Sequence, residues 1–348
     1  MAASRSTPPI PGASNLGARS HGTATQGTMT LGIVGFGIMG ERLLRAALDA
    51  PDAPIRPSAV WDPAPEAAAR LAAIAPGLPM LPSAAAVTEA CDCLYVAAPP
   101  AAHLPLAEAA LAAGRAVFLE KPLSHDLAAS RTFVAQAEAG GARAGVNFPM
   151  ASSPAVAQLL AWREDGSLGA PQSLEIEVAF AAWPRSWQKD ASGWLSRRAE
   201  GGFTREVVSH FLFLTRRLLG PLDLKEARAT YPGGDLAETA IETRLSAGGI
   251  PVRLRGTVGE TARDDTNAWT LHGSTGAIRL RDWSIAERRT EAGWSTAPGA
   301  LPNERMRPLV LRGQLEKVAA MTRGQPQGLA TLREALEVQE IVEGILAA

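Results

Sequence analysis

The segment Gly35–Gly40 contains three glycines at the spacing of a phosphate-binding loop. A short apolar run at 30–34 precedes it and residues with helical spacing follow it, so the loop joins a strand to a helix. Such glycines permit a tight turn, a close approach of the backbone to a pyrophosphate, and close packing of the helix on the sheet. The N–H groups at the start of the helix attract phosphate oxygens. The expected dinucleotide contacts in this loop are Gly35, Phe36, Gly37, Ile38, Met39 and Gly40.

Asp62 lies at the end of the next expected strand, about 20 residues beyond the last glycine, where an acid that binds a ribose is expected. Its carboxylate can accept hydrogen bonds from ribose hydroxyls and would repel a 2′-phosphate. Because Pro63 follows it, and not an arginine, the sequence favours NAD over NADP as the cofactor. The alternative is that Asp62 only caps the turn into the next helix.

Glu206 and His210 are four residues apart on an expected helix at about 203–219, so they share one face. The rest of this helix is largely apolar. A polar pair on a mostly buried helix needs partners or a function, since an unpaired buried polar group is destabilising. The pair is therefore either part of an active site or a satisfied pair at a domain boundary.

The elements that must position these residues fall into two parts. Strands and helices alternate from residue 30 to about 148, which predicts an α/β domain at 29–148, with a doubly wound parallel sheet of the Rossmann type. Ligands bind at the carboxyl ends of the strands in such sheets. The expected strands are 30–34, 59–61, 93–98, 116–119 and 144–148, and the expected helices after the glycine loop are 65–75, 104–113 and 127–139.

Residues 149–348 follow a different pattern and predict an α+β domain for substrate binding and oligomerisation. Apolar and polar residues alternate at 174–180 and again at 241–245, which is typical of strands with one buried face. An open, mostly antiparallel sheet with helices on one face is expected, and its other face is a natural surface for a homodimer or homotetramer. Helices at 308–322 and 331–347 close the chain and can pack back on the first domain; Thr331 and Glu334 fit a capping box.

Composition limits the classes of partner. The 348 residues have a formal net charge of −1, which argues against nucleic acid or an anionic membrane as the main partner. No apolar run is long enough to span a membrane. Two cysteines, Cys91 and Cys93, fit small buried side chains; no disulfide framework and no metal site are expected, which suits the cytoplasm. Residues 1–28 fit a disordered extension, an upstream start before Met29, or less well a transit peptide.

Further motifs resemble one family. The chain resembles the glucose–fructose oxidoreductase and inositol dehydrogenase family, known as Gfo/Idh/MocA, over about residues 30–348. Glu120-Lys121-Pro122 after a strand is the most specific match. The other matching pieces are the loop at 35–40, Ala98-Pro99 followed by His103, and Gly201-Gly202 followed by Glu206 and His210.

The resemblance implies a hydride transfer between NAD(P) and a sugar, polyol or related hydroxy or keto compound. It implies that Lys121 sits beside the nicotinamide and the reacting hydroxyl, and that His210 relays a proton with Glu206 beside it. Oxidising an alcohol requires loss of the hydroxyl proton, which a lysine or histidine can relay, and a cationic lysine stabilises developing alkoxide charge. The alternative for Lys121 is an exposed lysine in a loop. Further expected cofactor contacts are Ala98, Pro99, His103 and Glu120.

Departures from the family leave the substrate open. Glu206 stands where the family commonly has aspartate, and Phe213 stands where it often has a further acid. The segment 147–150 lacks an arginine that the family often has nearby. The stretch Trp183–Trp187, with the arginines that follow it, fits either a substrate pocket or a subunit interface. Expected substrate contacts are Asn147, Trp187 and Arg205.

Two other functions fit the same sequence. A non-catalytic regulator of the same fold would bind NAD(P) without turnover, but intact Lys121 and His210 favour an enzyme. An aldose–aldose oxidoreductase that retains its cofactor would resemble exported members of the family, and the missing secretory signal weakens that alternative.

Overall fold

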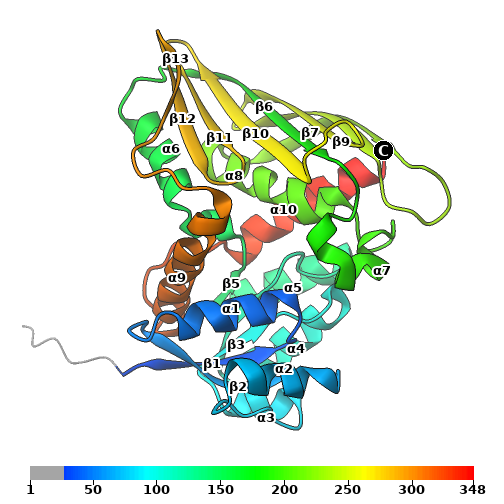
Figure 1. Ribbon diagram of the computed structural model, residues 1–348, viewed down its shortest axis with the longest axis vertical. Coiled ribbons are helices and arrows are strands. Elements are labelled where there is room, and N and C mark those ends of the chain that lie inside the picture. The colour runs from blue at the N-terminus through cyan, green and yellow to red at the C-terminus, as the bar shows by residue number, and fades with distance from the viewer. Residues whose placement is uncertain (1–26) are drawn as a thin grey trace, which may run out of the picture.

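The computed structural model describes residues 27–348, except for the side chains of Lys189 and Asp190, and contains two sheets (Figure 1). The extension expected at 1–28 lies outside the described residues, apart from its last two. Within 27–348, no helix is both long and apolar enough to cross a membrane.

The first sheet has five parallel strands in the order β2-β1-β3-β4-β5. Its central strands β3 and β4 are buried along their whole length, because helices cover both faces. The strands are β1 (Met29–Val34), β2 (Ile55–Trp61), β3 (Cys93–Val96), β4 (Ala116–Leu119) and β5 (Ala144–Val146). The helices are α1 (Ile38–Leu48), α2 (Glu66–Ile74), α3 (Ala84–Glu89), α4 (Pro100–Ala112) and α5 (Leu127–Ala139). Both cysteines are buried and free.

The second sheet has eight strands in the order β13-β12-β11-β10-β6-β9-β8-β7, and only β6 and β9 pair in parallel. The strands are β6 (Pro171–Phe180), β7 (Leu222–Thr230), β8 (Ala240–Ala247), β9 (Ile250–Val258), β10 (Asp265–Gly273), β11 (Ala277–Arg281), β12 (Ile285–Thr290) and β13 (Gly293–Thr296). The helices are η1 (Pro149–Ser152), α6 (Pro154–Glu164), η2 (Ser186–Ala191), α7 (Ser192–Leu195), η3 (Thr204–Val208), α8 (Ser209–Leu219), α9 (Asn303–Thr322) and α10 (Leu332–Leu346). The fold class predicted from the sequence is confirmed.

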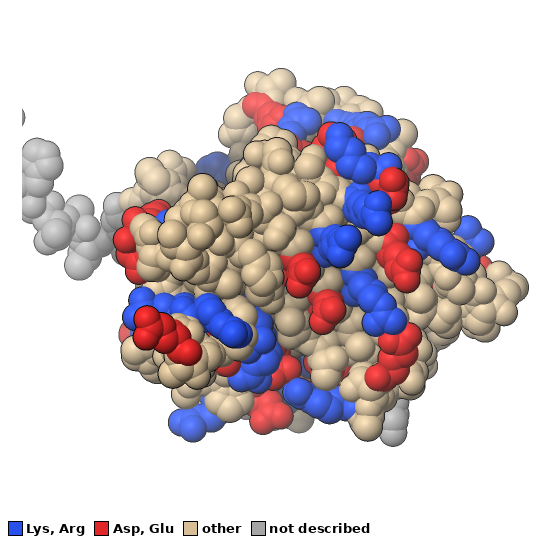
Figure 2. All heavy atoms as spheres, turned by 90° about the horizontal axis from the view of Figure 1, so that it is seen from above, with Lys and Arg blue, Asp and Glu red and all other residues tan. Residues whose placement is uncertain are grey.

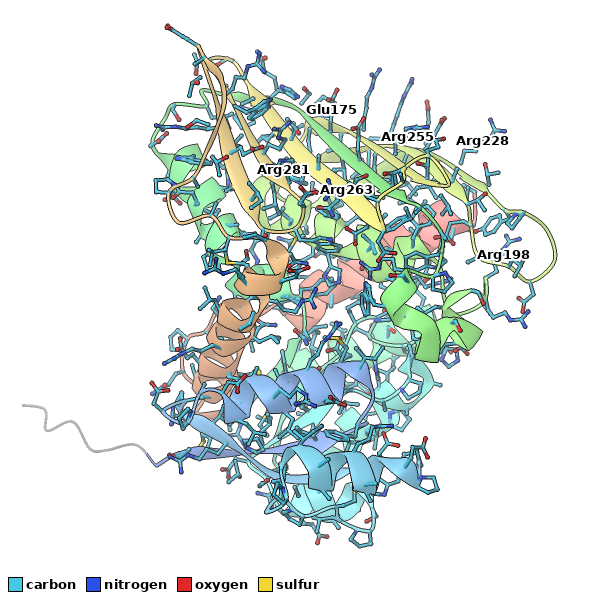
Figure 3. The ribbon with its side chains drawn as sticks, in the orientation of Figure 1. Glu175, Arg198, Arg228, Arg255, Arg263 and Arg281 are labelled. Atoms are coloured by element: carbon cyan, nitrogen blue, oxygen red, sulfur yellow. The ribbon has the colours of Figure 1, made fainter. Side chains whose placement is uncertain are left out.

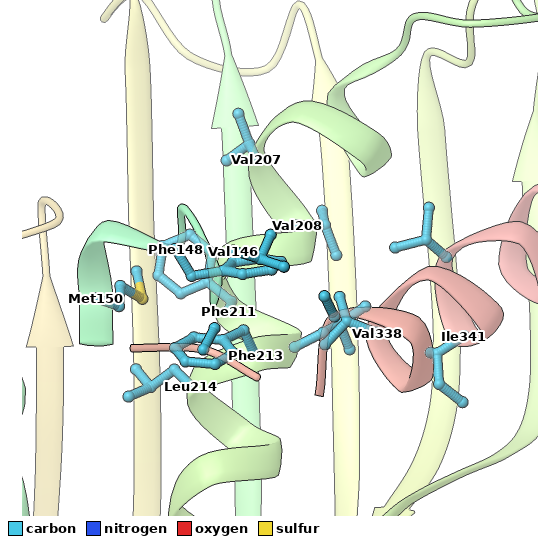
Figure 4. Packing of buried hydrophobic residues seen from close by; sticks show 14 of the residues in the cluster. Val146, Phe148, Met150, Val207, Val208, Phe211, Phe213, Leu214, Val338 and Ile341 are labelled. Carbon is cyan, nitrogen blue, oxygen red and sulfur yellow. The ribbon is translucent and has the colours of Figure 1, made fainter. Parts of the chain in front are cut away.

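Helices α8 and α10 lie under the face of this sheet that points toward the first sheet (Figure 1). Figure 4 shows the apolar side chains that fill this layer. Phe148 and Phe213 stack there with ring centroids 4.6 Å apart. The capping box at Thr331 and Glu334 begins α10 as predicted, with both reciprocal hydrogen bonds present.

The outer face of the second sheet is charged. Neighbouring strands place Glu177 beside Arg255, Arg255 beside Glu242, and Glu242 beside Arg228, so the sign of the charge alternates across the sheet. Arg255 and Arg228 point away from the first sheet in Figure 3, and Figure 2 shows acidic and basic side chains side by side on this end of the molecule. Opposite charges on adjacent strands attract one another. An oligomer that uses this face stays a prediction, and its contacts would be ionic rather than apolar.

Helix α9 completes the core of the first domain although it lies near the end of the chain. It packs against α1, β2 and β4. Leu311, Leu315 and Val318 belong to the same buried cluster as Leu31 and Phe118 of β1 and β4. The helix begins at Asn303, five residues before the start expected from the sequence, and includes Pro308. The Rossmann sheet therefore depends on residues that follow the second sheet in the chain.

The Leu315→Ala variant tests this dependence. Leu315 is fully buried, so the loss of its side chain should lower the free energy of unfolding by about 2–5 kcal/mol. Leu309→Ala on the same helix is the control, because Leu309 is 49% exposed and should change stability little. Urea denaturation of both variants checks the prediction. Equal stability of the two variants would contradict it.

Candidate active site

The conformation of the loop after β1 requires glycine at two of its three glycine positions. Gly35 has a φ of +92°, and a Cβ there would lie 2.5 Å from the backbone of Ala97. A Cβ on Gly40 would lie 2.0 Å from the carbonyl oxygen of Gly35. In contrast, a Cβ on Gly37 would meet nothing within 4 Å. The first and third glycines thus serve the turn itself, while the second leaves open space above the loop into which a ligand fits.

The start of α1 offers free hydrogen-bond donors to that space. Its N-cap residue, Gly37, has no side chain to cap the first turn. The first N–H groups of an α-helix have no partner within the helix and favour an anion. These features fit a pyrophosphate, as expected from the spacing of the glycines.

Asp62, at the end of β2, holds the glycine loop in place. Its carboxylate accepts hydrogen bonds from the N–H of Phe36 at 2.5 Å and from the N–H of Ala64 at 2.8 Å. It therefore caps the turn into the next helix, one of the two roles expected for it. Arg70 of α2, which the sequence analysis missed, donates to the carbonyl oxygen of Phe36 at 2.6 Å. An acidic and a basic side chain thus flank the same loop.

Glu120, directly after β4, is part of a buried polar network. The hydroxyl of Tyr95 and the amide of Asn147 both donate to its Oε1 atom, the second at 2.6 Å. Gln314 of α9 in turn donates to Asn147 at 2.5 Å. Burial raises the pKa of Glu120, although these hydrogen bonds and the charge of Lys121 oppose the shift. The network fixes the end of β4 from three sides.

His103 holds the segment that contains Lys121. Its two ring nitrogens lie 2.8 Å from the carbonyl oxygen of Pro122 and 2.7 Å from that of Ala98. The side chain is 1% exposed. His103 therefore links the loops after β3 and β4 as a positioning residue, and the cofactor contact expected from the sequence stays a prediction.

Lys121 joins the two domains at the carboxyl end of β4. Its ammonium lies 2.9 Å from the Oε1 atom of Glu206, and both side chains are largely buried. It also lies 3.5 Å and 3.4 Å from the carbonyl oxygens of Arg205 and Glu206. These two residues belong to η3, a π-helical turn that opens α8, and such turns occur often at functional sites. The buried carboxylate of Glu238 fixes the start of this turn by accepting the N–H of Thr204 at 2.8 Å.

His210 lies one turn further along α8, close enough for the charge of Lys121 to act on it. Its ring meets Phe148 and Trp283 edge to face, at 5.6 Å and 5.7 Å between centroids. Burial, together with the positive charges of Lys121 and Arg185, holds the pKa of His210 well below its usual value. No hydrogen bond to its ring nitrogens is present among the described residues. Glu206 pairs with Lys121 and not with His210, so it does not orient the imidazole directly.

Two of the expected substrate contacts have other partners. Arg205 forms two hydrogen bonds with Glu343 of α10, both 2.7 Å long, and donates to two backbone carbonyls as well. Asn147 is 1% exposed and belongs to the Glu120 network. Both residues therefore position parts of the site, and the substrate contacts expected of them stay a prediction. Trp187, in contrast, is 41% exposed and lies against Arg42 of α1.

Sequence reasoning missed residues that contact the site from other elements. Tyr95 lies in a buried apolar strand, where a hydroxyl needs a partner, and this was the one available signal. Gln314 had no local signal, because its role depends on the packing of α9. Within 27–348, no group of His, Cys, Asp and Glu side chains could hold a metal ion.

Comparisons with known proteins agree with this geometry. Residues 29–148 match the family model GFO_IDH_MocA, described as the oxidoreductase family with an NAD-binding Rossmann fold. No curated protein matches the sequence of the chain.

Solved structures share the fold over nearly the whole chain. A candidate myo-inositol dehydrogenase of Sinorhizobium meliloti is 21% identical, with a TM-score of 0.73 over 92% of this chain and 98% of that one. A levoglucosan dehydrogenase bound to NADH and levoglucosan is 18% identical, with a TM-score of 0.77 over 92% and 96%. An oxidoreductase of Agrobacterium radiobacter bound to NAD⁺, L-tartaric acid and magnesium is 17% identical, with a TM-score of 0.76 over 92% and 96%.

The neutral state of His210 gives a prediction about stability and pH. Below pH 6.5 an unfolded chain binds a proton at this histidine that the folded chain does not, so the free energy of unfolding decreases as the pH falls through that value. The decrease between about pH 7.5 and about pH 5.5 should therefore be smaller in His210→Gln than in the wild type. Urea denaturation at both pH values checks this. His125→Gln, which removes an exposed imidazole, should keep the wild-type decrease; an unchanged decrease in His210→Gln would refute the prediction.

Proposed function

We propose that the chain is a member of the Gfo/Idh/MocA oxidoreductase family, whose model matches residues 29–148, and that it is an NAD(P)-dependent dehydrogenase acting on a CH–OH group. The proposed substrate is a sugar, a polyol or a related hydroxy compound. One observation carries the proposal: the Lys121–Glu206 ion pair unites a Rossmann strand end with the helix that carries His210. The structural neighbours described above, a candidate myo-inositol dehydrogenase and a levoglucosan dehydrogenase, support this class of substrate.

The glycine loop, the start of α1 and Asp62 would hold the cofactor. The open space above Gly37 and the uncapped first turn of α1 fit a pyrophosphate, and the Asp62 carboxylate lies where a ribose would follow. When bound, the nicotinamide supplies the acceptor or donor of the hydride that the reaction moves. Ala98, Pro99 and Glu120 lie at the ends of the neighbouring strands and would complete the nicotinamide side of this site.

The chain's own residues handle the proton and the charge. His210 is held neutral, and no described residue occupies its ring nitrogens, so it can accept the proton of a substrate hydroxyl. The Lys121 ammonium, fixed by Glu206, stabilises the oxygen as it gains negative charge. In the reverse direction the same groups return a proton to a carbonyl oxygen. Glu206 acts here by holding Lys121 in place.

Removing Lys121 or His210 should reduce turnover. We expect Lys121→Met and His210→Gln to lower kcat by about 10²–10⁴-fold, with Lys121→Met the more severe because it also removes the charge that stabilises the oxygen. Glu206→Gln should lower kcat less, since it leaves the ammonium present but less firmly held. The measurement follows NADH absorbance with the substrate found by screening sugars, polyols and their keto forms.

Affinity for NADH separates loss of chemistry from loss of binding. None of the three side chains contacts the glycine loop, so the Kd for NADH should stay near the wild-type value in every variant. Lys225→Met, an exposed lysine on β7, is the control for loss of a positive charge. Full turnover in Lys121→Met would exclude the mechanism. NADH binding without turnover of any compound in the screen would favour a regulator instead.

Cofactor preference depends on Asp62 in this proposal. NADH should bind more tightly than NADPH, because a 2′-phosphate would meet the Asp62 carboxylate. In Asp62→Ser, the ratio of the Kd for NADPH to the Kd for NADH should fall by about tenfold or more, which is the scale of one unfavourable charge contact. Fluorescence titration of NADH and NADPH with both proteins checks this. Tighter NADPH binding by the wild type would instead assign the preference to Arg70, the cation beside Phe36, and Arg70→Ala should then abolish it.

A further inference from the structure

Three arginines from distant parts of the chain lie close enough for their charges to act on one another, and the charge of one of them, Arg185, also acts on His210. Arg42 lies on α1, Arg185 lies in the loop before η2, and Arg307 lies on α9. We call this group the arginine cluster (Arg42, Arg185 and Arg307). Arg42 and Arg307 are partly exposed, whereas Arg185 is only 8% exposed. The cluster thus borders solvent on one side and the proposed reaction site on the other.

Trp187 connects two members of the cluster. The guanidinium carbon of Arg42 lies 4.5 Å from the centre of the Trp187 ring, and that of Arg185 lies 4.7 Å from it. The Trp187 indole therefore contacts one arginine from each domain. Arg185 donates from Nε to Gln188 at 3.1 Å and from Nη1 to Asp265 at 3.0 Å. Arg42, in contrast, has no carboxylate partner within residues 27–348 and keeps N–H groups that can bind an anion.

A second set of contacts leads from Arg185 to His210. Arg185 forms an ion pair with Asp265 at 3.0 Å, and the indole N–H of Trp283 lies 3.4 Å from the same carboxylate oxygen. The Trp283 ring meets His210 edge to face. The positive charge of Arg185 also acts directly on His210. The arginine cluster and the proposed proton acceptor are therefore parts of one site.

The backbone at Trp283 is held in an uncommon conformation at this place. Asp282 and Trp283 form a turn between β11 and β12, with φ values of 49° and 69°. A bulky residue with positive φ is rare and persists where the surroundings impose it, often at functional sites. Here Asn267 fixes the turn by accepting the N–H of Trp283 at 2.8 Å. The result is an indole aimed at His210.

The positive charges of the cluster are poorly compensated by acids. Burial, followed by the charges of Arg307 and Arg185, lowers the pKa of Arg42 to about 10. Burial and the charge of Arg185 also lower the pKa of Arg307, although the carboxylates of Glu304 and Asp265 oppose this shift. Of the three arginines, only Arg185 has a carboxylate within ion-pair distance among the described residues. Bringing like charges together in a partly buried place is unfavourable unless an anion completes it.

We propose that the arginine cluster binds the anionic group of the substrate, which is a polyhydroxy compound bearing a carboxylate or a phosphate. This proposal rests on the proposed dehydrogenase function and narrows its substrate class. The anionic group would lie between Arg42, Arg185 and Arg307, and the reacting hydroxyl would lie further in, between His210 and Lys121. Trp187 and Trp283 would line the space that the carbon chain occupies.

The phosphate groups of the cofactor are the other anions that the arginine cluster could bind. The first turn of α1 and Gly37 already offer a phosphate site of their own. Arg185 pairs with Asp265, whose carboxylate lies beside the indole N–H of Trp283, and the Trp283 ring meets His210. This places the arginine cluster on the substrate side, and the experiment separates the two sources by saturating the cofactor site first.

The experiment begins with the full-length protein saturated with NADH, whose binding is itself the test of the proposed function. Tryptophan fluorescence then follows a titration with inorganic phosphate at constant ionic strength. The same protein is next assayed for oxidation and reduction with matched neutral and anionic compounds: D-glucose with D-glucuronate and D-glucose 6-phosphate, and D-sorbitol with D-gluconate. We expect saturable phosphate binding and a preference of about tenfold or more for the anionic members that react.

Variants assign the effect to the cluster. Arg307→Gln, which removes an arginine without an ion-pair partner among the described residues, and Arg42→Gln should each weaken phosphate binding by about tenfold or more and leave the Kd for NADH unchanged. Arg185→Gln also leaves Asp265 without its ion-pair partner, so its result is interpreted only together with the results of the other two variants. Arg228→Gln, on the outer face of β7, is the matched control and should behave as the wild type.

Three results would overturn the proposal while leaving the dehydrogenase function intact. Phosphate that fails to bind saturably to the NADH complex would show that no anion site remains beside the cofactor. Equal or better activity with the neutral compounds would show that the cluster does not select the substrate. A raised Kd for NADH in Arg42→Gln or Arg307→Gln, larger than the change for phosphate, would assign the cluster to the cofactor's phosphates.

Discussion

The ion pair between Lys121 and Glu206 is the contact on which the arrangement of the site depends. Lys121 belongs to the end of a Rossmann strand and Glu206 to the first turn of a helix in the second domain, so the pair sets the position of one domain's reactive groups relative to the other's. Both side chains are largely out of water, where an ion pair that loses one partner leaves a costly unpaired charge. The carbonyl oxygens of the π-helical turn add further acceptors around the ammonium, which is why the irregular turn at the start of α8 matters as much as the carboxylate.

Behind this pair, the polar network around Glu120 resists displacement of the loop. Tyr95 of β3, Asn147 after β5 and Gln314 of α9 reach the same place from three elements, and His103 holds the loop on its other side. A buried network in which each member has its partners is rigid and specifies one arrangement. The proposed chemistry requires such rigidity, because a proton acceptor and a stabilising cation act only when they lie within hydrogen-bond reach of the same oxygen.

The sequence predicted the elements with strong periodicity and the residues with local signals. The glycine loop, Asp62 and the Glu-Lys-Pro segment stand at strand ends, so their placement follows from chain order. The edge strands β7 and β13, and β12 beside β13, were missed, because many of their residues are exposed and few are large and apolar. The pairing of Glu206 with Lys121 could not be predicted, since it depends on how the two domains meet. The same limit applies to Arg205, whose bond to Glu343 depends on the packing of α10, and to the arginine cluster, whose members lie far apart in sequence.

The place of α9 in the first core has a consequence for how the protein is made. During synthesis the N-terminal strands leave the ribosome first, yet the side chains that cover one side of their sheet arrive only after the whole second sheet has been synthesised. Until then, apolar residues such as Leu31 and Phe118 lack part of their cover, and transiently exposed apolar surface of this kind favours aggregation and recognition by chaperones. A nascent chain that stops before residue 303 therefore holds both sheets but lacks α9 for the core of the first sheet and α10 for the core of the second.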